Sequence, residues 1–134
     1  MSFALDVRKF AEAINVKTSL AVRKISLDIL RSVVFKTPVD TGRARSNWFV
    51  GVGGPVVKAT DSHDTIGTST VNSGASQINK ASGDESIFIT NSLPYIGRLE
   101  NGYSQQAPAG MVAVTMASVQ AFVDKAIADA KSLS

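Results

Sequence analysis

The chain has 134 residues, of which 44% are hydrophobic and 19% charged, and its formal net charge at pH 7 is +3. This length and composition favour one folded domain with its own core and exclude an intrinsically disordered chain. The absence of cysteine excludes disulfides and thiolate chemistry, and no apolar run approaches the length that spans a bilayer. The N-terminus lacks a signal-peptide pattern, so export by the general secretory route is not expected.

Charge is distributed unevenly along the chain. Eight basic residues lie between Lys17 and Lys58, against two acidic ones, whereas from residue 59 onward seven acidic residues stand against four basic ones. Three interpretations remain open: ordinary solvated charge, a channel that faces nucleic acid, or acidic surface that meets basic surface between copies of the chain.

The first part of the chain is predicted to be helical. A short amphipathic helix is expected near the N-terminus because apolar residues recur at helical spacing, at Phe3, Val7, Phe10 and Ile14. After a weak break, a second helix carries apolar residues around more than half of its surface, and Pro38 ends it. A helix with so wide an apolar face is expected to be buried on two sides and to form the spine of the fold.

The segment from Thr37 to Trp48 is the first of two motif-like stretches. Asp40-Thr41-Gly42 is typical of a tight turn, because Asp can bond the backbone ahead of it and Gly accepts positive φ. From Ser46 the apolar pattern has period two, which predicts a strand that ends at Gly53-Gly54-Pro55. Residues 56–60 are its expected hairpin partner.

Arg43 and Arg45 lie two residues apart at the predicted start of this strand, so both are expected to point to one face. One interpretation is phosphate contact, because the guanidinium fork matches phosphate oxygens. The other is a structural or inter-subunit ion pair, with Glu100 and Asp40 as candidate partners. We favour the structural interpretation, because the chain shows neither the interleaved aromatic residues of single-strand binders nor a DNA-reading motif.

Residues 61–85 are rich in Ser, Thr, Gly, Asn and Asp, and are predicted to be a flexible polar excursion from a single domain that spans residues 1–134. Within it Val71, Ala75 and Ile78 share one face of a possible short helix, which Gly74 weakens. Glu85 to Thr90 then alternates between apolar and polar residues and predicts a strand.

The second motif-like stretch runs from Asn91 to Val112. Pro94 is well placed in the first turn of a short helix that Gly102 ends. Tyr95 and Tyr103, with Leu99 between them, form an aromatic edge on this helix. Either the stretch is a helix–loop–helix corner or it is a rigid epitope that docks onto a neighbour, since neutral hydrogen-bonding groups such as Gln106 suit interface rims.

The last helix is predicted from an unbroken apolar seam with steps of four and three. Its members are Val112, Met116, Val119, Val123, Ala126, Ala130 and Leu133. The seam packs either on the domain's own sheet or on another subunit. The fold class expected from these elements is α+β, a small, mainly antiparallel sheet of about three to four strands packed by the long N-terminal helix and the C-terminal helix.

No catalytic, cofactor or metal site is predicted. His63 is the single histidine and lies in the polar excursion, which does not support a zinc site or a nucleophile–base pair. The glycines at 51, 53 and 54 lead to Pro55 and not to a helix N-terminus, so they do not form a phosphate loop. We therefore do not expect an enzyme.

Together the two stretches resemble the tail-component family of long-tailed bacteriophages, whose members are described as head–tail joining, neck or tail-completion proteins. The resemblance rests on T-P-V-D-T-G-R at residues 37–43, a strand with Trp48, and N-x-L-P-Y-x-x-x-L-E-x-G-x-S-x-Q-A-P-x-G-M-V at residues 91–112. The match is collinear and covers nearly the whole chain apart from the excursion.

The resemblance implies a structural virion protein of the neck or upper tail, made in the host cytoplasm, without catalytic residues or cofactors. It would form a homo-oligomeric ring, typically a hexamer, between the tail tube and the capsid connector, with packaged DNA as a possible neighbour in the lumen. The residues expected at its interfaces are Asp40, Arg43, Arg45, Tyr95, Glu100, Tyr103 and Gln106. A tail terminator that caps the tube and a basic nucleic-acid-binding module are the alternatives.

Overall fold

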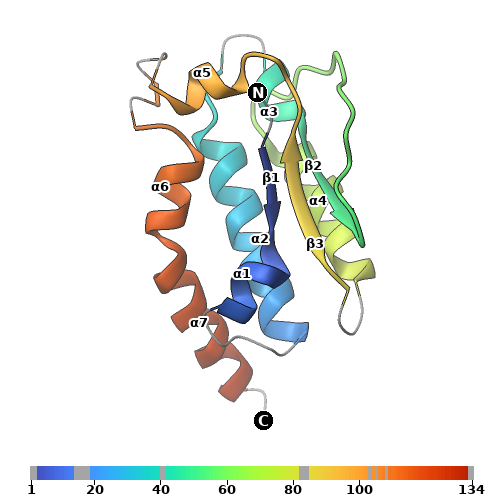
Figure 1. Ribbon diagram of the computed structural model, residues 1–134, viewed down its shortest axis with the longest axis vertical. Helices are drawn as coiled ribbons and strands as arrows, with labels where there is room; N and C mark the ends of the chain where they lie inside the picture. The colour runs from blue at the N-terminus through green and yellow to red at the C-terminus, as the bar shows by residue number, and fades with distance from the viewer. Residues whose placement is uncertain are drawn as a thin grey trace.

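The computed structural model describes residues 3–13, 19–39, 42–81, 85–102, 104, 106–107 and 109–132. Their elements in chain order are β1 (Phe3–Asp6), α1 (Val7–Ala13), α2 (Ser19–Lys36), α3 (Arg43–Ser46), β2 (Trp48–Val52), α4 (Thr68–Lys80), β3 (Ile87–Asn91), α5 (Ile96–Glu100), α6 (Val112–Ala117) and α7 (Val119–Ser132). The fold is α+β, as predicted, and Figure 1 shows the sheet beside a central α2.

The sheet has three antiparallel strands in the order β1-β3-β2. The prediction of a helix over the first fourteen residues is wrong for residues 3–6, which pair with β3 as strand β1, with Phe3 opposite Asn91. Helix α1 begins only at Val7, and the Asp6 carboxylate accepts a hydrogen bond of 3.0 Å from the Lys9 N–H. Asp6 therefore marks the change from strand to helix, because a carboxylate there satisfies an N–H group that the first helical turn leaves free.

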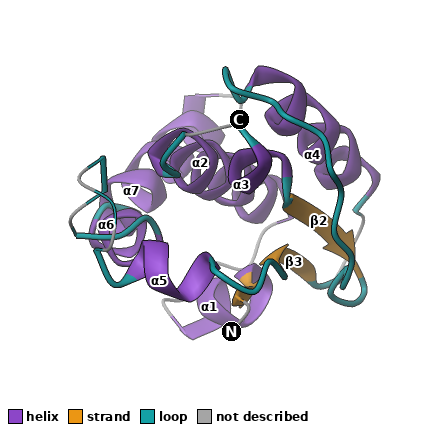
Figure 2. Cartoon of the chain, turned by 90° about the horizontal axis from the view of Figure 1, so that it is seen from above, coloured by secondary structure: helices purple, strands orange, loops and turns teal. Residues whose placement is uncertain are grey.

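Helix α2 is the spine of the core, as predicted from its wide apolar face. Its buried apolar side chains are Ala21, Val22, Ile25, Ile29, Leu30, Val33 and Val34. Viewed from above, α2 lies between α6–α7 on one side and α4 on the other (Figure 2). The hydroxyls of Ser32 and Thr115, 2.6 Å apart, join α2 to α6 inside the core. The chain leaves the helix before Pro38, where the sequence predicts its end.

Much of the predicted excursion is a packed helix. Helix α4 covers residues 68–80 and buries Val71, Gly74 and Ile78 against α2 and β2. Gly74 was expected to weaken this helix, but it allows α4 to pack closely against α2 and β2. A Cβ at this position would overlap a methyl group of Leu30 and lie 3.0 Å from a methyl group of Val50. The glycine costs some helix propensity but permits close packing.

Strand β2 ends at Val52, directly before Gly53-Gly54-Pro55 as predicted, but residues 56–60 do not form its hairpin partner. The chain crosses the outer face of the sheet instead, where the Val56 carbonyl accepts a 2.7 Å hydrogen bond from the Thr90 hydroxyl. Gly51 makes this path possible, because a Cβ on it would overlap the carbonyl oxygen of Gly54. Among the described residues, no strand therefore pairs with the edge of β2 that faces away from β3.

The C-terminal seam is divided into two helices at Ser118, and its main contact is α2, not the sheet. Val119, Val123 and Ala126 are buried along α7. The seam thus packs within the chain, as one of the two interpretations expects, but its main partner is helix α2 and not the predicted sheet.

Candidate functional site

The two motif-like stretches meet at one end of the molecule, where α2 ends. Gln106 joins them: its Oε1 accepts a 2.8 Å hydrogen bond from the Val39 N–H, and its Nε2 donates one of 2.9 Å to the Val39 carbonyl. This pair imitates the backbone pairing of a strand. It ties the loop after α2 to the loop before α6, and we call this region the motif end.

Arg45 links three backbone segments at the motif end. Its Nε donates to the Thr37 carbonyl at 2.9 Å, Nη2 to the Phe35 carbonyl at 2.8 Å and Nη1 to the Thr65 carbonyl at 2.9 Å. The guanidinium thus holds one carbonyl in the last turn of α2 and one just after the helix, where a helix leaves such groups unpaired and favours a positive charge. Its role is structural.

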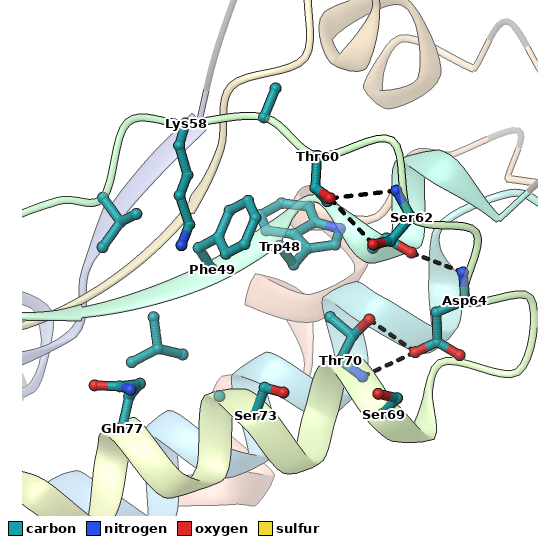
Figure 3. A pocket seen from close by; sticks show the side chains of 15 residues that line it. Trp48, Phe49, Lys58, Thr60, Ser62, Asp64, Ser69, Thr70, Ser73 and Gln77 are labelled. Atoms are coloured by element: carbon teal, nitrogen blue, oxygen red, sulfur yellow. Dashed lines mark hydrogen bonds between the residues drawn. The ribbon is translucent and has the colours of Figure 1, made fainter.

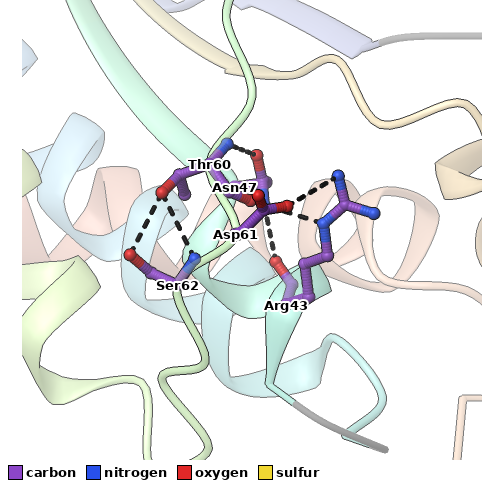
Figure 4. Close-up of polar contacts among 5 residues, drawn as sticks. All are labelled: Arg43, Asn47, Thr60, Asp61 and Ser62. Carbon is purple, nitrogen blue, oxygen red and sulfur yellow. Dashed lines mark hydrogen bonds and ion pairs between the residues drawn. The ribbon is translucent and has the colours of Figure 1, made fainter.

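Arg43 points elsewhere, which corrects the prediction that the two arginines share a face. Both lie in the one-turn helix α3, not at the start of β2. Residues two positions apart in a helix project on nearly opposite sides of it. The Arg43 guanidinium lies 3.5 Å from Asp61, whose side chain is 96% exposed, and 3.4 Å from the Thr60 carbonyl (Figure 4). Beside it Asn47 forms a two-way pair with the Thr60 backbone, at 2.8 and 2.9 Å.

Glu100 is not the ion-pair partner that was expected for these arginines. Its carboxylate caps α6: Oε1 accepts from the N–H groups of Met111 and Val112 at 2.8 and 2.7 Å, and Oε2 from that of Ala113 at 2.8 Å. A carboxylate is favoured here because the first N–H groups of a helix have no partners within it.

The remaining predicted interface residues divide into two groups. Tyr95 is half-buried, packs against the core, and its carbonyl accepts the Arg98 N–H at 3.1 Å at the start of α5. Asp40 and Tyr103 lie outside the described residues. Of the seven candidates, Arg45, Glu100 and Gln106 therefore use their polar groups in hydrogen bonds to this chain's own backbone, and Arg43 makes an exposed pair.

The motif end also exposes two large apolar side chains. Phe35 is 45% and Ile66 73% exposed, and both belong to segments whose carbonyls Arg45 holds. A depression of about 350 Å³ beside Phe35 is also lined by Pro38, Arg45 and Gln106. The exposure of these apolar residues was not predicted. That of Phe35 could have been, because Phe35 lies off the predicted buried face of α2.

A second hollow, of about 680 Å³, runs along β2 between the 56–62 segment and α4; we call it the β2 groove (Figure 3). Its polar walls include Lys58, Ser69, Ser73 and Gln77, and Trp48, Phe49 and Val50 form its apolar part.

Asp64 closes one end of the β2 groove. Its carboxylate accepts the N–H groups of Gly67 and Thr70 at 2.9 and 2.8 Å and the Thr70 hydroxyl at 2.8 Å. Burial raises the pKa of Asp64, but these hydrogen bonds, together with the charge of Arg45, outweigh burial and lower it. The ionised carboxylate is thus committed to the N-terminus of α4.

Within the described ranges, no group of three or more His, Asp or Glu side chains is placed to hold a metal ion, and no helix is both long and apolar enough to cross a membrane. Comparison of the chain with protein-family models, with curated proteins and with solved structures finds no match.

Proposed function

We propose that this chain is a structural subunit of the neck or upper tail of a long-tailed bacteriophage, a tail-completion protein that joins the tail tube to the capsid connector. In this role it assembles as a ring, with six copies as the expected number. Its function lies in its surfaces, and no residue is assigned a catalytic task.

The observation that carries the proposal is the motif end. The two stretches on which the resemblance rests lie 67 residues apart at Val39 and Gln106, yet they are bonded to each other there. Arg45 and Glu100 hold the surrounding backbone, and the rigid surface exposes Phe35 and Ile66. Exposed apolar side chains on a fixed backbone are typical of surfaces that bind another protein.

A ring places a physical requirement on its subunits. Subunits of a closed ring contact each other through two different surfaces, so each copy must carry a patch that fits another part of its neighbour. We assign one of these surfaces to the motif end.

The test is the mass of the purified protein by light scattering, over a range of protein and salt concentrations, alone and with tail tubes isolated from the cognate phage. A discrete ring, alone or on tubes only, supports the proposal. The Phe35→Ser/Ile66→Ser double variant should remain folded and lose assembly, whereas Leu20→Ser, an exposed apolar residue at the other end of α2, should keep it. A folded monomer that ignores tubes contradicts the proposal.

The same experiment distinguishes the ring proposal from the alternative of a nucleic-acid-binding module. Binding through phosphate contacts weakens steeply as salt rises, whereas assembly through apolar surface tolerates salt. Salt-sensitive DNA binding by a monomer would move the function to the basic region.

A further inference from the structure

The floor of the β2 groove is a free strand edge. Gly53 donates a 2.8 Å hydrogen bond to the Ser86 carbonyl, in register with the pairing of β2 and β3. In an antiparallel pair, hydrogen-bonded residues alternate with residues whose backbone groups point away from the partner strand. By this alternation Gly51 and Phe49 bond to β3, and Val50 directs its N–H and carbonyl to the groove.

The groove is shaped for an extended chain and not for a whole domain. The edge is recessed, since Val50 is only 6% exposed, and the 56–62 segment and α4 stand on either side of it. Ser69, Ser73 and Gln77 recur every four residues along the facing side of α4, so they present hydroxyl and amide groups in a row. Such groups suit the backbone and side chains of a peptide strand.

The charge of the groove favours an acidic occupant. Lys58 lines it, and its ammonium group rests 4.7 Å from the centroid of the Phe49 ring; among the described residues no carboxylate pairs with it. Asp64, the acidic residue of the lining, is occupied by the N-terminus of α4. The positive charge is therefore available to a ligand.

We propose that the β2 groove binds an extended, acidic peptide segment of a partner protein, which adds a strand to the free edge of β2 while a carboxylate of the peptide pairs with Lys58. About five residues of the segment pair with the five residues of β2. The proposal stands independently of the neck assignment. Single-stranded nucleic acid fits the groove less well, because Lys58 covers the Phe49 ring and Trp48 is buried, which leaves no open aromatic face for a base.

The experiment selects peptides of about nine residues from a random displayed library on the full-length protein, and measures the binding of the enriched peptides to variants. Ser73→Tyr fills the groove from α4, and Gln77→Tyr fills it one turn further on. Ser76→Tyr is the matched control, because Ser76 is also an exposed serine of the same helix but does not line the groove. Melting temperatures identify any variant that fails to fold, and the second groove variant then takes its place.

We expect the enriched peptides to be rich in Asp and Glu and in β-branched residues. Lys58→Gln and the groove variants should weaken their binding by about tenfold or more, and Ser76→Tyr should leave it unchanged. Methylation of alternate peptide amides should abolish binding, since it removes strand pairing. Three results overturn the proposal: no enrichment over the starting library, enriched peptides that bind the groove variants as tightly as the wild type, or binding of oligothymidylate that Ser73→Tyr abolishes.

Discussion

The indole Nε1 of Trp48 donates a 2.8 Å hydrogen bond to the hydroxyl oxygen of Thr37. That hydroxyl in turn donates to the Val33 carbonyl in α2, and both Thr37 and Trp48 are buried. The bond joins the first residue of β2 to the residue that follows α2, and it satisfies the one polar atom of a buried indole. This hydrogen bond explains why the first motif-like stretch begins with Thr37 and ends with Trp48.

Replacement of Thr37 by Val keeps the shape of the side chain but leaves the Trp48 N–H unpaired. We expect a loss of about 1–3 kcal/mol in the free energy of unfolding, the usual cost of a buried donor without an acceptor. Urea unfolding followed by the fluorescence of Trp48, the single tryptophan, measures this loss. Thr68→Val, an exposed threonine at the start of α4, is the control and should change little; equal losses would show that the bond has no special role.

Glu100→Gln should destabilise the corner between α5 and α6. The carboxylate serves three N–H groups of α6 with two oxygens, whereas an amide offers one oxygen and no charge. A loss of about 1–2 kcal/mol is expected, as for other helix caps. Glu12→Gln, on the exposed side of α1, is the comparison, and an unfolding midpoint that moves equally for both variants would contradict the assigned cap.

Much of the fold could be predicted because its longer elements carry a clear period. Helix α2 and strands β2 and β3 follow from apolar residues at steps of 3.6 or 2. Strand β1 could not be predicted, because Phe3 and Val7 also fit a helical period and the strand depends on pairing with Asn91, far along the chain. Tertiary pairing decides such short segments.

Residues of the motif end could be selected from the sequence, but the contacts that they make could not. Arg45, Glu100 and Gln106 were chosen because their side chains are charged or polar and lie in turn-rich stretches. Their partners are the carbonyls and N–H groups of other backbone segments, which no side-chain pattern reveals. The opposite directions of Arg43 and Arg45 follow from α3, a single turn of four residues that periodicity cannot distinguish from the start of a strand.

Gly74→Val should destabilise the protein by about 2 kcal/mol or more, in the upper part of the range for overpacked cores. A side chain at this position enters the space that Leu30 and Val50 fill, and Leu30 is fully buried. Ser76→Val introduces the same side chain on the exposed side of α4, where Ser and Val have similar helix propensity, so its stability should change little. Gly→Val by itself improves helix propensity, so a loss seen for Gly74→Val beyond that of Ser76→Val reports the packing effect. Thermal unfolding of both proteins measures that difference, and a difference near zero would show that α4 can move away from α2 without cost.

Asp64→Ala should reveal a stability contribution that depends on pH. The pKa of Asp64 is lowered from its ordinary value of 3.8, so the ionised carboxylate stabilises the folded state at every pH above that value, and the contribution is lost as the pH falls through the lowered pKa. At neutral pH the variant should be less stable than the wild type by about 1 kcal/mol, a typical N-cap contribution. Urea unfolding at neutral pH and at a series of pH values below 3.8 should show the two proteins converging. Asp61→Ala, an exposed carboxylate, is the control, and a gap that stays constant into acid would refute the cap.

Arg45→Lys should destabilise the motif end although it keeps the positive charge. An ammonium group is a single point and cannot reach the Phe35, Thr37 and Thr65 carbonyls together, as the guanidinium fork does. We expect a loss of about 1–3 kcal/mol from the broken bonds to the carbonyls, and faster cleavage by a protease of low specificity within residues 61–67, which Arg45 ties to α2. Arg43→Lys makes the same chemical change two residues away, where the contacts to the exposed Asp61 and to the Thr60 carbonyl are long, at 3.5 and 3.4 Å, so its stability should change by about 0.5 kcal/mol or less. If both variants are cleaved in this segment at the same rate, Arg45 is not what holds it.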